Sequence, residues 1–342
     1  MPSELPPGQA LTRHFPIVGE TAPAAGAADA SRWVVEFSGL LAQPLRLTLA
    51  ELLALPQQTR RIDIHCVTGW SRLGVDIVGL PLALLLDRAG VDSRAAYVRF
   101  VAHSARRHDT SLPLPLARAE TWLVHSMDGV PLSAAHGGPL RTITPGRYFY
   151  KSLKWLAAVE LLGEDHPGYW ERESAYHNEA DPWREQRFDE ARVAAAEDVA
   201  RLRAAMDFAP FRDQVWIKAR LGGWTPATRD FSGMQLKYCS LRNARLVGAD
   251  FSGANLSLSS LEGADLRGAR FHASDIEGAS FAGADLREAS IVDSAASATR
   301  FFRDFANGKR LAARVDGLHL RGVSGLLDEQ RAFLLAAGAR FD

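Results

Sequence analysis

The residue best placed for chemistry is one of only two cysteines in the chain. Cys66 stands in the stretch DIHCVTGWS, at the end of an alternating apolar segment and just before a Thr-Gly turn. In RRIDIHCV the alternation puts Ile62, Ile64 and Cys66 on one face of a predicted strand and His65 on the other. Cys66 is therefore either a buried structural cysteine or a donor of sulfur.

Three chemistries can be weighed for this cysteine. A Cys–His nucleophile needs a base beside the thiol, but His65 points to the opposite face and no Cys–His family signature surrounds the site. A zinc site needs about four ligands, and the histidines lack metal-ligand spacing. The third chemistry is a thiolate that binds a soft metal whose other ligands come from a cofactor.

A second segment, HGGPLRTITPGRYFYKSLKW at residues 136–155, is suited to a bound anion. Gly137 and Gly138 let backbone amides approach a ligand closely, and Arg141 offers a planar fork of donors. Further positive charge comes from Arg147, Lys151 and Lys154. Burying so many cations without partners is costly, so a phosphate or a polar heterocycle would pair with them. A solvated basic loop is the alternative.

The elements around these segments predict an α+β fold up to about residue 183. RWVVEFSGLL, AAYVRFVAHS and LRTITP are typical of strands. TLAELLALP predicts a short helix that stops at Pro56, and LPLALLLDRAGV predicts a helix that ends at Gly90. The helices interleave irregularly with the strands, which favours α+β over a doubly wound sheet.

A helix is predicted where the first half ends. Asp181 can cap a helix whose first position is Pro182. Apolar residues then recur at spacings of three and four, at Phe188, Ala191, Ala195, Val199, Leu202 and Met206. We predict a connecting helix packed on a domain, with a partner-binding amphipathic helix as the alternative.

The second half carries an internal repeat of five residues. A large apolar residue returns at Phe231, Leu236, Leu241, Leu246, Phe251, Leu256, Leu261, Leu266, Phe271, Ile276, Phe281, Leu286 and Ile291, and a small residue precedes almost every one by two positions. Neither a helix nor a strand has this period, so the chain must turn a corner every five residues. The spacing of twenty between Phe231, Phe251 and Phe271 predicts four sides, with these rings stacked. The pattern fails at Ala296.

Segments such as GADFSGANL and GADLRGARF resemble the pentapeptide-repeat proteins. The resemblance implies a right-handed quadrilateral β-helix with twenty residues per coil. Cys239 would then be a small buried residue stacked over Ser259, and a C-terminal helix at about 328–337 would cover the open end. Residues 231–293 hold eight acidic and six basic residues. This near balance disfavours DNA mimicry and favours a scaffold or an interaction surface.

The first half resembles the molybdopterin-binding domain of the sulfite oxidase superfamily, nearest to the catalytic subunit branch of the protein-methionine-sulfoxide reductases. The resemblance covers roughly residues 11–188. It is carried by five blocks in order: DIHCVTGWS, VDIVGLPLALLLDRAGV, HDTSLPL, MDGVPLSAAHGGPLRTITPGRYFYKSLKW and PGYWERESAYHNEADPWREQRF. It implies molybdenum-molybdopterin as cofactor and oxygen-atom transfer as the reaction, with electrons passing to a separate protein.

The resemblance also implies roles for single residues. Cys66 falls on the cysteine that binds molybdenum in this family. The residues that hold the pterin and its phosphate fall on His136, Arg141, Ser152, Leu153 and Lys154, and Ala102 or His103 lies near a further contact.

The sequence departs from the family pattern at Ile77, His108 and Ala175, near the substrate funnel of such enzymes. The substrate is therefore expected to be a small oxyanion or a sulfoxide, without a closer choice. Candidates for an arginine cluster that would bind sulfite are Arg72, Arg106, Arg107 and Arg147. The alternative function is a weakly catalytic or non-catalytic cofactor-binding protein whose solenoid binds another protein.

Composition excludes several partners. Forty basic residues balance forty acidic ones, so no net field draws the chain to nucleic acid or to an anionic membrane. No apolar stretch is long enough to cross a bilayer, and the N-terminal stretch has no signal-peptide pattern. We expect a cytoplasmic protein.

Four segments are expected along the chain. They are a molybdopterin-binding domain at 1–188, a helical linker at 189–226, the repeat domain at 227–305 and a capping segment at 306–342.

Overall fold

The structure, a computed structural model, describes residues 5–12, 15, 23, 29–104, 108–296, 299–304 and 310–342, without the side chains of 303 and 304. The chain forms two compact units, Met1–Asp189 and Glu190–Asp342. Each unit has its own apolar core. None of the helices described could span a bilayer.

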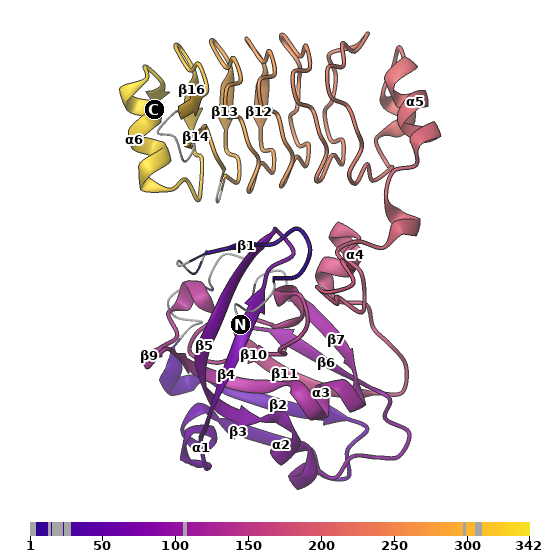
Figure 1. Cartoon of the computed structure of the whole chain (residues 1–342), viewed down its shortest axis with the longest axis vertical. Helices are drawn as coiled ribbons and strands as arrows, with labels where there is room; N and C mark the ends of the chain where they lie inside the picture. The colour runs from indigo at the N-terminus through magenta and orange to yellow at the C-terminus, as the bar shows by residue number, and fades with distance from the viewer. Residues whose placement is uncertain are drawn as a thin grey trace. The chain divides into compact units, whose positions relative to one another are not determined.

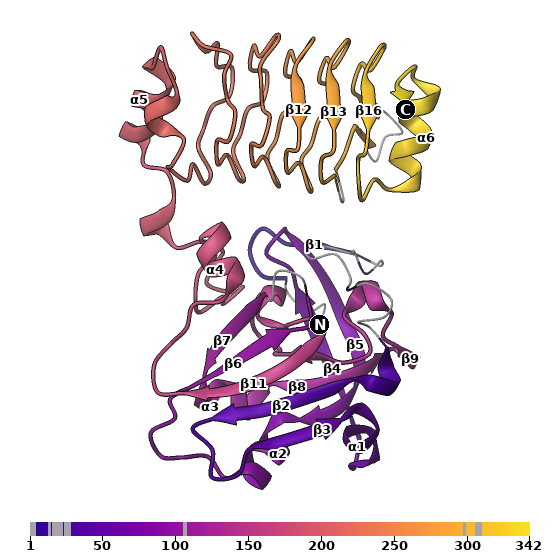
Figure 2. The same cartoon turned by 180° about the vertical axis from the view of Figure 1, so that it is seen from behind.

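The first unit is built on two mixed sheets (Figures 1 and 2). One sheet has the order β1-β5-β8-β10, with β4 paired to β5 and β9 to β8. Its strands are β1 (Ala10–Leu11), β4 (Gln58–His65), β5 (Trp70–Pro81), β8 (Trp122–Met127), β9 (Val130–Pro131) and β10 (Arg141–Ile143). The other has the order β3-β2-β11-β6-β7, with strands β2 (Val34–Gly39), β3 (Leu45–Thr48), β6 (Tyr97–Ala102), β7 (Asp109–Pro113) and β11 (Leu156–Leu162).

Short helices connect these strands. They are η1 (Ala30–Arg32), α1 (Leu49–Ala54), α2 (Leu82–Ala89), α3 (Leu114–Glu120), η2 (Ala134–His136), η3 (Phe149–Lys151) and α4 (Tyr169–Ser174). Thr48 and Glu51 form a capping box at the start of α1. Gly90, at φ 66°, ends α2 as its position after the helix predicts. Helices set beside mixed sheets give the α+β arrangement that the sequence predicted.

The helix predicted from Pro182 is wrong in its extent. Glu185 adopts a left-handed φ angle of 53°, which a continuous helix cannot contain. Phe188 is drawn into an antiparallel bridge with Tyr176. The helix here is α5 (Ala196–Ala204), flanked by the short turns η4 (Glu190–Arg192) and η5 (Ala209–Phe211). Its Val199 and Leu202 are part of the apolar core of the second unit.

The second unit stacks successive coils between α5 and α6 (Figure 1). Parallel bridges recur every five residues and join each residue to the one twenty positions later, as in Gln235 to Asn255 and Ser240 to Ser260. The short strands of the unit are β12 (Arg270–His272), β13 (Ser290–Val292), β14 (Phe302–Asp304), β15 (Arg310–Ala312), β16 (His319–Arg321) and β17 (Arg340–Phe341), and α6 spans Asp328–Ala336.

The large residues of the five-residue series point into the coil, as predicted. The ring centroids of Phe231 and Phe251 lie 4.8 Å apart, and those of Phe251 and Phe271 lie 5.0 Å apart. Cys239 is buried, and its backbone amide donates to Ser259 Oγ at 2.9 Å. Burial raises the pKa of the Cys239 thiol to about 12, so this cysteine is a packed, protonated side chain.

The coils begin earlier than predicted. The segment 189–226 is not a helical linker throughout, because Val215 and Arg220 already form bridges with Gln235 and Ser240. The inward positions of this first coil hold Trp216 and Leu221, which continue the five-residue spacing backwards from Phe231. The small residues that mark later repeats are mostly missing there, so the repeat signal is weak.

The capping segment 306–342 also contributes a coil. Asp285, Ser290 and Ala295 pair with Arg314, His319 and Ser324, which lie 29 positions later. The coil thus contains an insertion, part of which lies outside the described residues. α6 follows and covers the end, where Leu334 is fully buried. The helix predicted at about 328–337 is confirmed.

Candidate functional site

Cys66 lies in a tight turn between two paired strands of the first sheet. β4 ends at His65 and β5 starts at Trp70. The amide of Cys66 donates to the carbonyl of Trp70 at 2.8 Å, and the amide of Gly69 donates to the carbonyl of Cys66 at 3.0 Å. Gly69 has a φ of 97°, which only glycine adopts readily. The turn fixes where the cysteine points.

Distant segments hold this turn in place. Arg187 donates to the carbonyls of Val67 at 2.8 Å and Gly8 at 2.9 Å, and its guanidinium lies 5.5 Å from the ring centroid of Tyr148. Gln9 Nε2 donates to the carbonyl of Cys66 at 3.0 Å. The backbone around the cysteine is therefore fixed from both ends of the first unit.

The Cys66 side chain is 6% exposed, with Sγ 3.1 Å from Thr68 Oγ1. Burial raises the pKa of the Cys66 thiol, while Thr68 and the cations Arg187 and Lys154 act in the opposite direction. Only the thiolate binds metals well. A metal cation at the sulfur would supply the charge needed to hold it deprotonated.

Arg141 is the most deeply buried cation of the segment 136–155. It is 1% exposed and starts β10. Its guanidinium donates to the carbonyls of His136 at 2.8 Å and Ser152 at 2.7 Å and lies 4.3 Å from the ring centroid of Phe149. Burial lowers the pKa of Arg141 to about 9. No carboxylate among the described residues forms an ion pair with it.

His136 and Lys154 lie beside Arg141. The ring nitrogens of His136 contact Ser133 Oγ at 2.9 Å and the Phe15 carbonyl at 3.1 Å. Burial lowers the pKa of His136, and nearby cations act in the same direction. A neutral ring then donates from Nε2 to Phe15 and accepts at Nδ1. Lys154 Nζ donates to the carbonyl of Ala135 at 3.0 Å.

Ser152 and Leu153 line the same loop but differ in what they can offer. Ser152 Oγ accepts from the amide of Thr144 at 3.0 Å, which leaves the hydroxyl proton to donate. The amide of Leu153 donates to Thr142 Oγ1 at 2.7 Å, and its carbonyl accepts from the Thr142 amide. The backbone of Leu153 is therefore used within the protein, and its role as a cofactor contact stays a prediction.

Other predicted charges have structural partners. Lys151 is fully buried and pairs with Glu171, while also donating to Asn178 Oδ1 at 3.0 Å. Arg72 pairs with Asp128. Arg147 donates to the carbonyl of Gly146 at 2.8 Å, but its buried Nε has no partner in the described part of the chain. Arg106 and Arg107 lie outside the described residues.

The remaining predicted positions are placed as follows. Ala102 is buried at the end of β6, and the His103 ring lies 4.5 Å from that of Trp33. Ile77 is buried in β5, and His108 is buried just before β7. Ala175 ends α4 at φ 49° and ψ 35°, a left-handed conformation that glycine adopts more easily.

Sequence reasoning missed the contribution of Arg187. It lies near the end of the block PGYWERESAYHNEADPWREQRF, 120 residues from Val67 along the chain. The one sequence signal that could have indicated Arg187 was its place in a segment that resembles the family. Nothing in local spacing connects it to Cys66.

The donor set suits a large anionic group that carries a soft metal. Arg141 is a buried cation without a carboxylate, and the buried indole Nε1 of Trp70 has no acceptor among the described residues. Buried donors without acceptors are rare in folded proteins. A ring acceptor would satisfy the Trp70 donor, a phosphate would balance the charge of Arg141, and the Cys66 sulfur would supply a soft ligand. In the described part of the chain, no three His, Cys, Asp or Glu side chains converge as a metal site.

Comparisons with known proteins show the family of the first unit and the repeats of the second. Residues 21–170 match the oxidoreductase molybdopterin-binding domain, and residues 230–263 and 264–301 match pentapeptide repeats. The chain is 40% identical to the uncharacterised oxidoreductase YuiH of Bacillus subtilis, over 54% of this chain and 91% of that protein. It is 35% identical to the putative protein-methionine-sulfoxide reductase subunit YedZ1 of Azospira oryzae, over 42% of this chain and 54% of that one.

Among solved structures, the sulfane dehydrogenase SoxCD of Paracoccus pantotrophus matches with a TM-score of 0.40 and 22% identity, over 43% of this chain and 42% of that one. The chain spans about half the length of the reductase relative named above.

The first unit is thus an oxidoreductase domain of the sulfite oxidase type, and pentapeptide repeats follow it. The chain belongs to the oxidoreductase molybdopterin-binding family, and its cofactor is molybdenum-molybdopterin.

Proposed function

We propose that this oxidoreductase transfers an oxygen atom to or from a small oxyanion or a sulfoxide, and that a separate protein exchanges electrons with it. The observation that carries the proposal is the placement of Cys66. Its thiol lies in a turn held by Arg187 and Gln9, where burial raises the pKa of the thiol while the cations Arg187 and Lys154 act in the opposite direction. A cysteine used for packing alone would not need such support.

The chain's own residues would bind and orient the cofactor. Cys66 would donate its thiolate sulfur to the metal, and Arg141 and Lys154 would provide charge for the phosphate. Ser152 would donate its hydroxyl proton, His136 would lie beside the pterin as a neutral ring, and Leu153 would contact it through its side chain. When bound, the molybdenum would supply the two-electron chemistry of oxygen-atom transfer.

The direction of oxygen transfer is part of the proposal. The name of one relative describes a putative reductase of methionine sulfoxide in proteins. This chain covers about half of that relative, so its substrate is part of the proposal. A sulfoxide and sulfite are the two substrates to test, because they represent transfer in opposite directions.

The central test compares the two cysteines. Cys66→Ser removes a soft donor with little change in volume, and Cys239→Ser makes the same change in the buried core of the solenoid. We expect Cys66→Ser to keep its pterin, to lose the sulfur-to-molybdenum charge-transfer absorption and to lose oxygen transfer. Cys239→Ser should keep both signals at some cost in stability. Unchanged absorption and activity in Cys66→Ser would show that this cysteine is only structural.

The second candidate function is a cofactor-binding protein with little turnover, whose solenoid binds another protein. The fused repeats favour it, because a solenoid offers an extended surface for partners. Wild-type protein with full molybdenum and pterin content that transfers oxygen to neither substrate would favour this candidate.

We infer a right-handed, four-sided coil for the repeats, and electron density from a crystal would test it. We also infer a cytoplasmic location, which two free cysteines and the absence of a disulfide among the described residues support. Cell fractionation with antibody detection would test that.

A further inference from the structure

The backbone ladder of the solenoid follows one rule on both sides of a local break. Each inward residue donates its amide to the next coil, as Leu221 does to Ser240 at 2.7 Å and Phe231 to Asp250 at 2.8 Å. The residue two positions later does the same, as Gly223 does to Arg242 at 2.7 Å. Between these positions, the donors due at residues 226 and 228 are missing.

Two residues explain the break. Pro226 occupies the inward position and has no amide proton to donate. Thr228 occupies the turn position where Gly223 and Gly233 adopt φ angles of 64° and 69°, but Thr228 has no positive φ. A β-branched residue is strained in that conformation, so the turn does not form.

The break leaves two backbone acceptors open. The carbonyls of Arg245 and Val247 would accept from residues 226 and 228, and neither accepts a backbone amide in the part of the chain described. The neighbouring contacts persist, since the amide of Arg245 donates to the carbonyl of Trp224 at 2.8 Å. The two neighbouring coils are therefore not hydrogen-bonded at these two positions, but they remain joined on either side.

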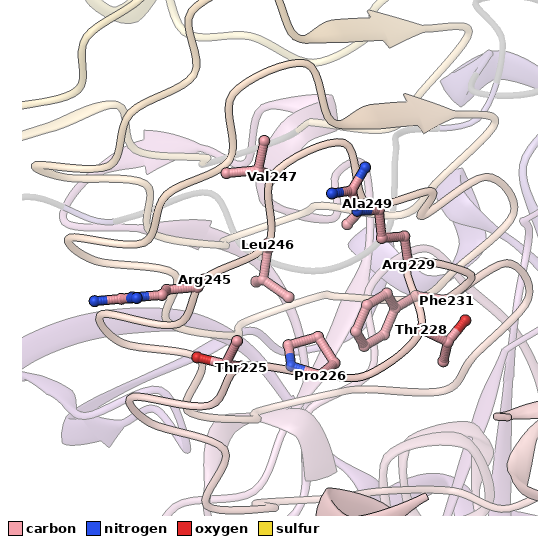
Figure 3. A pocket seen from close by; sticks show the side chains of 9 residues that line it. All are labelled: Thr225, Pro226, Thr228, Arg229, Phe231, Arg245, Leu246, Val247 and Ala249. Atoms are coloured by element: carbon pink, nitrogen blue, oxygen red, sulfur yellow. The ribbon is translucent and has the colours of Figure 1, made fainter. Parts of the chain in front are cut away.

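A pocket of about 190 Å³ lies at this break (Figure 3). Phe231 and Leu246, both buried, form its apolar base together with Pro226. Val247 at its edge is 36% exposed. By volume the pocket can hold about six water molecules, or one side chain with its own backbone.

The rim of the pocket carries two arginines without counterions. Arg229 and Arg245 are exposed, and no carboxylate in the described chain pairs with either. Several other arginines of the coils are paired, as Arg242 is with Glu262 and Arg270 with Asp250. In Figure 3 the Arg245 side chain extends away from the pocket, so Arg229 is the nearer cation.

The two open carbonyls and the unpaired arginine together limit which kind of ligand can bind in this pocket. A phosphate or a nucleic acid backbone would satisfy the arginines but would be repelled by two open carbonyl oxygens. An extended peptide carries amide donors spaced two residues apart, as the neighbouring coils do, and an acidic side chain adds the negative charge. We propose that this break is a docking site for an acidic residue in an extended segment of a partner protein.

In this docking mode the peptide amides donate to the carbonyls of Arg245 and Val247, and the carboxylate pairs with Arg229. A small apolar neighbour of the acidic residue covers Leu246. The inference is independent of the chemistry at Cys66, because it uses residues of the second unit alone.

The experiment titrates the full-length isotopically labelled chain with acetyl-Ala-Val-Asp-Val-Ala-amide and follows amide resonances by NMR. Two control peptides carry Asn in place of Asp, or N-methyl groups on both valines. We expect the acidic peptide to shift the amides of Arg229, Arg245 and Val247, and each control peptide to bind about tenfold more weakly.

Protein variants test the same contacts. The double variant Pro226→Ala with Thr228→Gly restores the missing donor and the turn, so it should close the pocket, keep or raise thermal stability and weaken peptide binding about tenfold. Arg229→Glu should weaken binding similarly. Arg220→Glu, at an exposed arginine of the same coil outside the pocket, should leave peptide binding unchanged.

Several results would overturn the proposal. They are no shift of these amides with the acidic peptide, equal binding of the N-methylated peptide, and unchanged binding in the ladder-restoring variant. Displacement of the peptide by inorganic phosphate or by an oligonucleotide at similar concentration would also overturn it, since it would show a simple anion site.

Discussion

Replacing Arg141 should separate the stability of the protein from its hold on the cofactor. The pKa of Arg141 falls from 12.5 to about 9 because the guanidinium is buried. A fall of this size corresponds to about 5 kcal/mol against the charged form in the folded state. At pH 7, which is below both values, Arg141 is charged whether the chain is folded or unfolded, so the full cost opposes folding.

The hydrogen bonds of Arg141 act against this cost. Removing the guanidinium leaves the buried carbonyls of His136 and Ser152 without their donor, at about 1–3 kcal/mol each. The two effects nearly cancel for Arg141→Met, which keeps most of the side-chain volume. We therefore expect the cofactor-free variant to unfold within about 2 kcal/mol of the wild type.

Cofactor retention should change far more. A charge-assisted contact to a phosphate is worth about 1.5–3 kcal/mol, so occupancy under competition should fall about tenfold to a hundredfold. Arg141→Lys should rescue it in part, because a point charge lacks the planar fork. Arg61→Met, at an arginine whose side chain is 70% exposed, is the matched control.

The assay has two readouts. Pterin fluorescence after oxidation and metal analysis give occupancy in protein purified under limiting cofactor, and urea unfolding of the cofactor-free form gives stability. Full pterin content in a folded Arg141→Met variant would refute the assignment. Equal loss in Arg61→Met would show that the effect is not specific to the buried cation.

Three other perturbations follow from the structure. Phe251→Asp places an unpaired carboxylate between two stacked rings and should cost more than about 4 kcal/mol, whereas Asn243→Asp, exposed on a turn, should cost little; equal melting temperatures would argue against the five-residue register. Arg187→Gln should loosen the cysteine turn, cost about 1–3 kcal/mol and weaken the sulfur-to-molybdenum absorption; an unaltered spectrum in the loaded variant would contradict this role. Burial lowers the pKa values of His65 and His136 below 6.5 in the folded state, so the unfolded chain takes up protons first and stability should fall as the pH drops below about 6.5; flat urea midpoints between pH 7.5 and 5.5 would count against it.

Local pattern was sufficient for much of the architecture. The alternation in RRIDIHCV predicted the strand β4, because side-chain direction in a strand has a fixed period; the strand ends at His65, one residue before Cys66. The five-residue series placed Phe231, Phe251 and Phe271 in one stack, because a chain that turns a corner every five residues brings positions twenty apart together. Short-range signals of this kind act within a few residues and need no knowledge of distant contacts.

Local pattern misled where tertiary contacts prevail. The helical stripe from Phe188 to Met206 was periodic, but the bridge between Phe188 and Tyr176 takes its first residue out of the helix, which spans only Ala196–Ala204. Met206 is consequently 77% exposed. Propensity is a weak prior that packing overrides.

The sequence by itself determined the repeat, the strand that presents Cys66 and the basic segment around Arg141, because these depend on spacing along the chain. Only the tertiary structure decided how each cation near the candidate site is buried and paired. Lys151 is neutralised by Glu171, whereas Arg141 is buried without a carboxylate among the described residues and Arg187 reaches the cysteine turn from 120 residues away. The physical reason is that a charge acts through its distance, burial and partners in space, and sequence separation carries none of these.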